Sequence, residues 1–235
     1  MKSMTEPTLH PAIRRVPPQA EPLSSDVFLM EGESRCYVFD AGNSDAAYEA
    51  IRQLPKPVTF ILSHFHRDHT GNLSRLEGEI LGGARTCKSI GRGTRVDAPL
   101  LIEDGIRLLV QPCVSPHAPG CLILTVDEQL TFLGDLPYAQ PGKGSGEITG
   151  MLRTLQGVKT EAFVLSHGET FRAIPKAELM EQLSKGKNVR SLCNTEETPR
   201  NTWNRGESIC GSKQNASSRS TSEAFSKKSK VHKRL

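Results

Sequence analysis

Three histidines and one aspartate directly follow a strongly apolar run, and this segment constrains the fold more than any other. Residues 58–62 are β-branched, aromatic or leucine, as expected for a buried strand, and the next seven read Ser-His-Phe-His-Arg-Asp-His. His64 and His66 point the same way, because side chains of an extended chain repeat every two residues. Asp68 and His69 fall in the following turn and can be aimed at a neighbouring point. Imidazole and carboxylate ligands suit Zn²⁺, Fe and Mn, so the segment predicts a metal site.

Further histidines and an aspartate occur where other apolar runs end. His117 lies in a Pro-His-Ala-Pro-Gly turn, Asp135 follows the run 130–133, and His167 follows the run 162–165. Taken singly, each histidine is more simply explained as a hydrogen-bonded or surface imidazole, and the aspartate as a strand-end cap. Their occurrence together with the first cluster favours metal ligation. The site could belong to a working enzyme or to one that has kept its ligands and lost turnover.

The rest of the chain predicts a loop-rich α/β or α+β protein. Residues 1–22 are rich in proline and predict an extended lead-in that ends in an edge strand. The runs 27–30 and 36–39 predict a hairpin, and Ser44 or Asp45 can cap the helix that follows. We further expect strands at 58–62, 79–81, 106–110, 122–126, 130–133 and 162–165, helices at 45–54, 148–155 and 175–183, and loops at 82–99 and 141–146.

The histidine cluster resembles the His-x-His-x-Asp-His signature of the metallo-β-lactamase superfamily. Other segments resemble further motifs of that family, in the same order along the chain. These are the Asp-x-Gly turn at 40–42, the histidine-bearing turn at 116–120, the strand ending in an aspartate at 132–135 and the final histidine at 165–168. The resemblance covers about residues 25–185. It implies a four-layer αββα sandwich with the metals at one rim, between the two sheets.

The resemblance also implies a binuclear site built from seven side chains. His64, His66 and His117 would hold one divalent metal ion, Asp68, His69 and His167 the other, and Asp135 would bridge both. Zinc is the expected metal, with iron or manganese as alternatives. A hydroxide between two dications about 3.5–4 Å apart would be the nucleophile, because coordination lowers the pKa of water towards 7.

Two side chains are candidates for direct roles in catalysis. Asp68 could accept a proton and pass it to the leaving group. Tyr138, three residues after Asp135, could donate a hydrogen bond to a substrate carbonyl. A similarly spaced tyrosine occurs in the quorum-quenching lactonases of the superfamily that this chain resembles, and the alternative is a tyrosine packed on the rim. Ser63 and Ser166 each precede a ligand and are expected to support it by hydrogen bonds.

The formal charge of +4 is unevenly distributed along the chain. Residues 186–235 hold 11 lysines and arginines against four glutamates, whereas residues 1–185 carry a net charge of −3. Apolar content also falls beyond Gly186, so we expect a hydrolase domain at 23–185 and a disordered basic tail at 186–235. Six scattered cysteines indicate reduced thiols. Without a visible secretory signal or membrane-spanning run, the expected location is cytoplasmic.

These observations predict a binuclear metal-dependent hydrolase that cleaves a small ester, thioester or lactone. The alternatives are a phosphodiesterase or nuclease of the same fold, with the basic tail contacting phosphates, and a non-catalytic metal-binding module. A small molecule is the expected partner, nucleic acid is disfavoured as one, and no membrane contact is expected. The resemblance disfavours glyoxalase II activity, because residues 186–235 do not resemble the helical domain of that enzyme. It disfavours β-lactamase activity because those enzymes usually replace Asp68 or Asp135.

Overall fold

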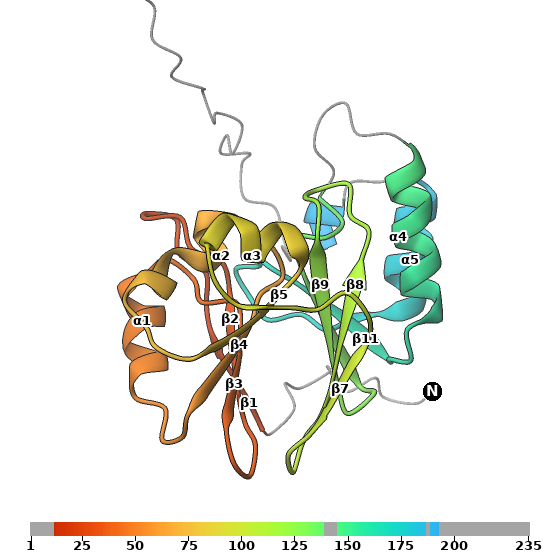
Figure 1. Ribbon diagram of the computed structural model, residues 1–235. Helices are drawn as coiled ribbons and strands as arrows, with labels where there is room; N and C mark the ends of the chain where they lie inside the picture. Colours follow the sequence, from red (N-terminus) through yellow and green to blue (C-terminus); the bar gives the residue numbers. More distant parts are fainter. Residues whose placement is uncertain (1–11, 139–144, 187–188, 193–235) are drawn as a thin grey trace, which may run out of the picture. The chain divides into compact units, whose positions relative to one another are not determined.

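Two six-stranded sheets lie face to face, with helices on their outer sides (Figure 1). The computed structural model describes residues 12–138, 145–186 and 189–192. The first sheet contains, from edge to edge, β1 (Ile13–Val16), β2 (Val27–Glu31), β3 (Cys36–Phe39), β4 (Val58–Ile61), β5 (Glu79–Gly82) and β6 (Thr94–Arg95). The second contains β12 (Ile174–Pro175), β11 (Ala162–Leu165), β10 (Leu130–Gly134), β9 (Cys121–Val126), β8 (Arg107–Cys113) and β7 (Leu100–Glu103).

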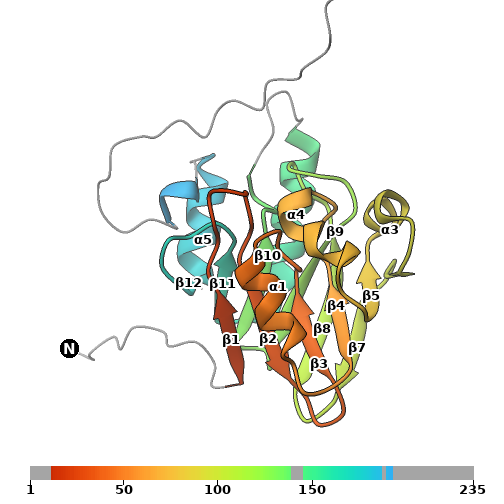
Figure 2. The same cartoon turned by 90° about the vertical axis from the view of Figure 1, so that its left-hand side faces the viewer.

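The described helices form the two outer layers. The first sheet is accompanied by α1 (Asp45–Arg52), α2 (Arg67–Thr70), the 3-10 helix η1 (Gly71–Ser74) and α3 (Ala84–Ile90), and the second by α4 (Ser145–Gly157), α5 (Lys176–Ser184) and the 3-10 helix η2 (Val189–Leu192). Ile51 of α1 belongs to the same apolar cluster as Val38 of β3, and α1 lies in front of this sheet in Figure 2. Met151 of α4 and Leu179 of α5 pack with Phe163 of β11. The layers therefore follow the expected αββα order.

Alternate residues of the central strands pack into different apolar clusters. Phe28 and Met30 of β2 lie in the cluster between the sheets, whereas Val27 and Leu29 lie in the cluster beneath α1. Both faces of the strand are buried, which explains why its sequence is continuously apolar rather than alternating. Across the sandwich, the ring centroid of Phe132 on β10 lies 4.4 Å from that of Phe28.

Strand direction brings several strand ends to one rim of the sandwich. β3 and β4 run parallel, as do β10 and β11, so within each pair the carboxyl ends lie at the same edge. β9 is antiparallel to both β8 and β10, so the turn from β8 to β9 lies at the edge where β10 ends. The polar segments that follow these strands are therefore neighbours in space although they are distant in sequence.

Most strands and α1 lie where the sequence predicts them. Ser44 caps α1, because its Oγ accepts a hydrogen bond from the backbone N–H of Ala47 at 3.2 Å. The prediction of a loop at 82–99 is wrong, because the structure has α3 and β6 there. α3 follows Gly83, which offers no side-chain cap, and it buries only two residues, so its sequence pattern is weak. The sequence also fails to predict β7, three of whose four residues are exposed.

The packed part of the chain begins earlier and ends later than predicted. β1 forms the expected edge strand, so residues 13–16 of the predicted lead-in belong to the first sheet. Val189 of η2 is 2% exposed and packs among core residues of the second sheet, beyond the predicted domain end at Lys185.

Residues 1–11, most of the glycine-rich loop at 141–146 and the predicted tail from residue 193 lie outside the described residues. Within the described ranges, no helix combines the length and apolar character needed to cross a bilayer.

Phe132→Ala is expected to destabilise the protein by about 3–5 kcal/mol, because the ring is fully buried between the sheets and its loss leaves a cavity. Urea unfolding of the metal-free protein would measure this change. Leu101→Ala on β7 is the control, since the leucine is 44% exposed and its loss should change stability by no more than about 0.5 kcal/mol. Equal effects of the two substitutions would contradict the assignment of the core.

Candidate metal centre

The seven predicted ligands come together at the rim where the strand ends meet. His64 and His66 follow β4, Asp68 and His69 lie on α2, His117 lies in the turn between β8 and β9, Asp135 follows β10 and His167 follows β11. They form two groups, in each of which the ligating atoms lie within 4.8 Å of one another. The first group is His64, His66 and His117, and the second is Asp68, His69, Asp135 and His167.

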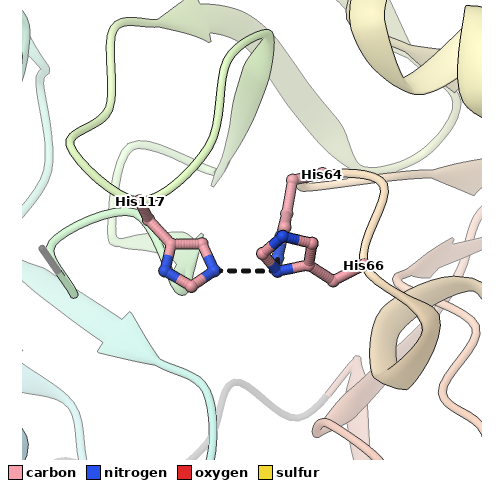
Figure 3. A group of neighbouring side chains, drawn as sticks. All are labelled: His64, His66 and His117. Atoms are coloured by element: carbon pink, nitrogen blue, oxygen red, sulfur yellow. Dashed lines mark hydrogen bonds between the residues drawn. The ribbon is translucent and has the colours of Figure 1, made fainter. Parts of the chain in front are cut away.

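The first group consists of three imidazoles that face one another (Figure 3). Nδ1 of His66 lies 2.9 Å from Nε2 of His64 and 3.0 Å from Nε2 of His117. Burial, together with repulsion from neighbouring histidines, lowers the pKa of His66 and lowers that of His64 well below its ordinary value. Burial also lowers the pKa of His117. At neutral pH these rings are therefore uncharged and have lone pairs that can bind a metal ion.

The second group pairs two imidazoles with two carboxylates. Nε2 of His167 lies 3.2 Å from Oδ2 of Asp68 and 3.3 Å from Oδ1 of Asp135. Burial alone would lower the pKa of His167, but these carboxylates raise it to about 9. Burial opposes the charge of His69 in the same way, yet Asp40 and Asp135 raise the pKa of His69 well above its ordinary value. Despite burial, the same imidazoles lower the pKa of Asp68 and hold that of Asp135 well below the usual range.

Asp135 stands between the two groups. Its Oδ1 lies 3.4 Å from Nε2 of His69, and its Oδ2 lies 3.6 Å from Nε2 of His117. Each oxygen therefore faces a different group. This placement fits a carboxylate that contacts two cations.

Two buried atoms at the centre test whether the residues fit a metal ion. Within the described parts of the chain, Nε2 of His69 and Oδ1 of Asp135 are buried and make no hydrogen bond, although they lie 3.4 Å apart. A buried polar atom without a partner costs about 1–3 kcal/mol, so such atoms need an explanation. A divalent cation bound by both atoms would supply one, and nitrogen and carboxylate oxygen are suitable donors for it.

Asp40 and Ser63 hold the histidines of both groups in place. Nδ1 of His69 lies 2.7 Å from Oδ2 of Asp40, which also accepts a hydrogen bond from Oγ of Ser63 at 2.7 Å. The backbone N–H of Ser63 donates to Oδ1 of Asp40, and Oγ of Ser63 lies 3.0 Å from Nδ1 of His64. A carboxylate on Nδ1 leaves Nε2 of His69 free to bind a metal ion. The sequence assigns Asp40 only to a turn and misses this role, whereas the expected support from Ser63 is present.

Tyr138 is placed differently from a residue that contacts substrate. The side chain is buried, and its hydroxyl donates a hydrogen bond to the backbone carbonyl of Ser166 at 2.8 Å. Its own carbonyl lies 2.9 Å from Nδ1 of His117. This geometry favours the packed alternative, in which Tyr138 connects the His117 turn to the segment that carries His167.

Comparisons with known proteins agree with this architecture. Residues 20–80 match the sequence profile of the metallo-β-lactamase superfamily. An archaeal superfamily protein from Sulfolobus tokodaii superposes with a TM-score of 0.59, at 18% identity, over 83% of this chain and 91% of that one. The chain is therefore similar to the metallo-β-lactamase superfamily in sequence over residues 20–80 and in fold.

Other solved structures with a similar fold are similarly distant in sequence. A metallo-β-lactamase from Cronobacter sakazakii is 16% identical, with a TM-score of 0.58 over 77% of this chain and 90% of that one. A variant of a flavo di-iron protein from Thermotoga maritima is 16% identical, with a TM-score of 0.51 over 67% of this chain and 52% of that one. No curated protein matches the chain in sequence. The superfamily fold and the two His/Asp groups together support a metal-dependent hydrolase.

At pH 7.5, the ligand side chains of the second group are expected to release at least one proton on metal binding, whereas those of the first group release none. Only a neutral imidazole binds a metal ion, and His167, with a pKa of about 9, is protonated at this pH. The apparent affinity of the second group should therefore rise with pH up to about 9. Calorimetric titration in buffers of different ionisation enthalpy counts the protons. No release at either step would contradict this charge assignment.

Tyr138→Phe is expected to lower the free energy of unfolding by about 1–2 kcal/mol, because the buried carbonyl of Ser166 loses its donor. Turnover should stay nearly unchanged, since the hydroxyl proton is donated to the Ser166 carbonyl. Urea unfolding and steady-state kinetics on one preparation would measure both quantities. A fall in kcat of about 10²-fold with unchanged stability would instead show that the phenol stabilises the reacting carbonyl.

Proposed function

We propose that the protein is a binuclear metal-dependent hydrolase that cleaves a small ester, thioester or lactone. The observation that carries the proposal is the pair of ligand groups with Asp135 between them at one rim of the sandwich. Neither group is a surface cluster, because His64 and His69 are fully buried and Asp135 is 6% exposed. Such a concentration of buried imidazoles and carboxylates is typical of metal centres and is costly in any other role.

The proposed ligand sets follow the geometry of the two groups. His64, His66 and His117 would hold one ion, Asp68, His69 and His167 the other, and Asp135 would contact both. Divalent ions bound there would lower the pKa of water and polarise the scissile carbonyl as Lewis acids. We propose zinc, which suits nitrogen and oxygen donors, with iron and manganese as the alternatives to be tested.

Asp68 is the proposed proton carrier. Its side chain is 14% exposed, more than that of Asp135, and contacts with His167 and His69 keep its pKa low. At neutral pH it is therefore a carboxylate that can accept a proton from the attacking water. Returning that proton to the departing oxygen or sulfur would complete the cleavage without further groups.

An apolar side chain beside the site favours a small organic acyl group as the substrate. Phe65 is half-buried between the two histidines that follow β4, and its ring centroid lies 4.9 Å from that of His66. Apolar side chains next to convergent polar groups are the usual lining of small-molecule sites.

The proposal is tested by metal analysis together with a substrate panel. Protein purified without added metal, and the same protein reconstituted with zinc, iron or manganese, would be assayed on a thioester, a lactone and bis-p-nitrophenyl phosphate. Two metal equivalents with thioester or lactone turnover are expected. Cleavage of the phosphodiester alone would favour the phosphodiesterase alternative, and metal binding without turnover would favour a binding module.

Asp68→Asn is expected to reduce kcat by about 10²–10⁴-fold, because the amide cannot carry the proton. Metal content is measured on the same preparations. Asp97→Asn is a matched control, since Asp97 is an exposed carboxylate paired with Arg95 on another surface element. An Asp68→Asn variant that keeps both metal content and turnover would contradict the proposed role.

A further inference from the structure

An ion pair joins the first sheet to the turn that carries His167. Asp26, which directly precedes β2, is 1% exposed, and its Oδ1 accepts a hydrogen bond from Nε of Arg15 at 2.5 Å. Its Oδ2 accepts a hydrogen bond from the backbone N–H of His167 at 2.8 Å. Arg15, on β1, also donates through Nη2 to the backbone carbonyl of Gly168. The pair thus connects β1 and β2 of one sheet to the end of β11 in the other.

The backbone held by this pair has an uncommon conformation. His167 has a φ of +67°, in the left-handed region that residues with a Cβ rarely adopt. The Asp26 carboxylate accepts a hydrogen bond from the backbone N–H of His167, and the Arg15 guanidinium donates one to the backbone carbonyl of Gly168. Such a conformation persists only where the surroundings impose it, and here they impose it on a candidate ligand.

The segment that contains Asp26 also contacts the other part of the second group. The backbone N–H of Ser25 donates to the carbonyl of Asp68 at 2.9 Å. Residues 25–26 therefore contact both the segment that carries His167 and the segment that carries Asp68. Nε2 of His167 and Oδ2 of Asp68 lie 3.2 Å apart. A small displacement of this segment would change the distance between these ligands.

Stability alone does not explain why a charge is buried at this place. Replacing a buried ion pair by apolar residues of similar volume is often neutral or stabilising, because removing two charges from water offsets their attraction. The Arg15 side chain is 13% exposed and the Asp26 side chain 1% exposed, so this is a buried ion pair. Apolar residues could not replace the two hydrogen bonds that Asp26 and Arg15 make to the backbone N–H of His167 and the backbone carbonyl of Gly168.

We propose that Arg15 and Asp26 are positioning residues that hold His167 in its ligating conformation. The inference rests on the proposed function in one respect, that His167 is a metal ligand. It predicts that loss of the pair weakens metal binding by the second group and leaves the first group unaffected.

Two variants of the full-length protein separate positioning from stability. Asp26→Asn keeps the size of the side chain but has only one acceptor oxygen for its two donors. The double substitution Arg15→Met with Asp26→Leu removes the charges and fills their volume, so the metal-free protein should melt at the wild-type temperature or above. Glu128→Gln is the control, because it removes an acid from another arginine pair, at the turn between β9 and β10.

The first measurement is hydrogen–deuterium exchange of the metal-free proteins over the peptide that contains residues 166–169. Exchange in this peptide should be at least about tenfold faster in both variants than in the wild type and in the Glu128→Gln control. The His167 amide loses its acceptor in the double variant, and in Asp26→Asn it must compete with the charged Nε of Arg15 for the single remaining oxygen. Unchanged exchange would overturn the proposal whatever the protein does with metals. Loss of folding in both variants would also overturn it, since the pair would then be required for stability.

The second measurement is zinc binding in competition with a chromophoric chelator. One of the two zinc equivalents should lose affinity by about 10–100-fold in both variants, the range seen when residues that orient metal ligands are replaced, while the other equivalent keeps its affinity. Equal weakening of both equivalents, or of neither, would overturn the proposal. A wild-type protein that binds fewer than two zinc ions would contradict the proposed binuclear function, and the exchange data would still decide whether the pair holds His167.

Discussion

The buried carboxylate of Asp135 is the charge on which the arrangement of the site depends. It faces His69 and His167 through one oxygen and His117 through the other. Together with Asp40 and Asp68, its negative charge raises the pKa of the converging imidazoles of the second group against the effect of burial. Gly134 makes this placement possible, because its φ is +57° and a Cβ at this position would lie 2.6 Å from Oγ of Ser63.

Packing between the sheets determines the distances between the ligands. Each group takes side chains from both sheets, since His64 and His69 follow β4, whereas His117 and His167 belong to the second sheet. The aromatic contact between Phe28 and Phe132 lies on the strands whose ends carry Asp26 and Asp135. Protein stability and metal binding are therefore coupled, because both depend on the same relative position of the sheets.

Much of this architecture follows from local sequence patterns, and the remainder depends on contacts that are distant in sequence. The apolar runs predict most strands, and the spacing of His64, His66, Asp68 and His69 predicts their convergence. α3 and β7 are missed because short, exposed elements leave little apolar pattern. Asp26 is missed for a different reason, since its partner His167 lies 141 positions away and only the fold brings them together. The orientation of the Tyr138 hydroxyl depends on the fold in the same way.

Anomalous X-ray diffraction from crystals grown with zinc would test the central claim most directly. Two metal positions are predicted, one bound by His64, His66 and His117 and the other by Asp68, His69 and His167, with Asp135 contacting both. The anomalous signal at each position, compared between wavelengths on either side of the zinc absorption edge, would identify the metal. A single peak, or zinc peaks only at surface residues away from Asp135, would contradict the binuclear centre.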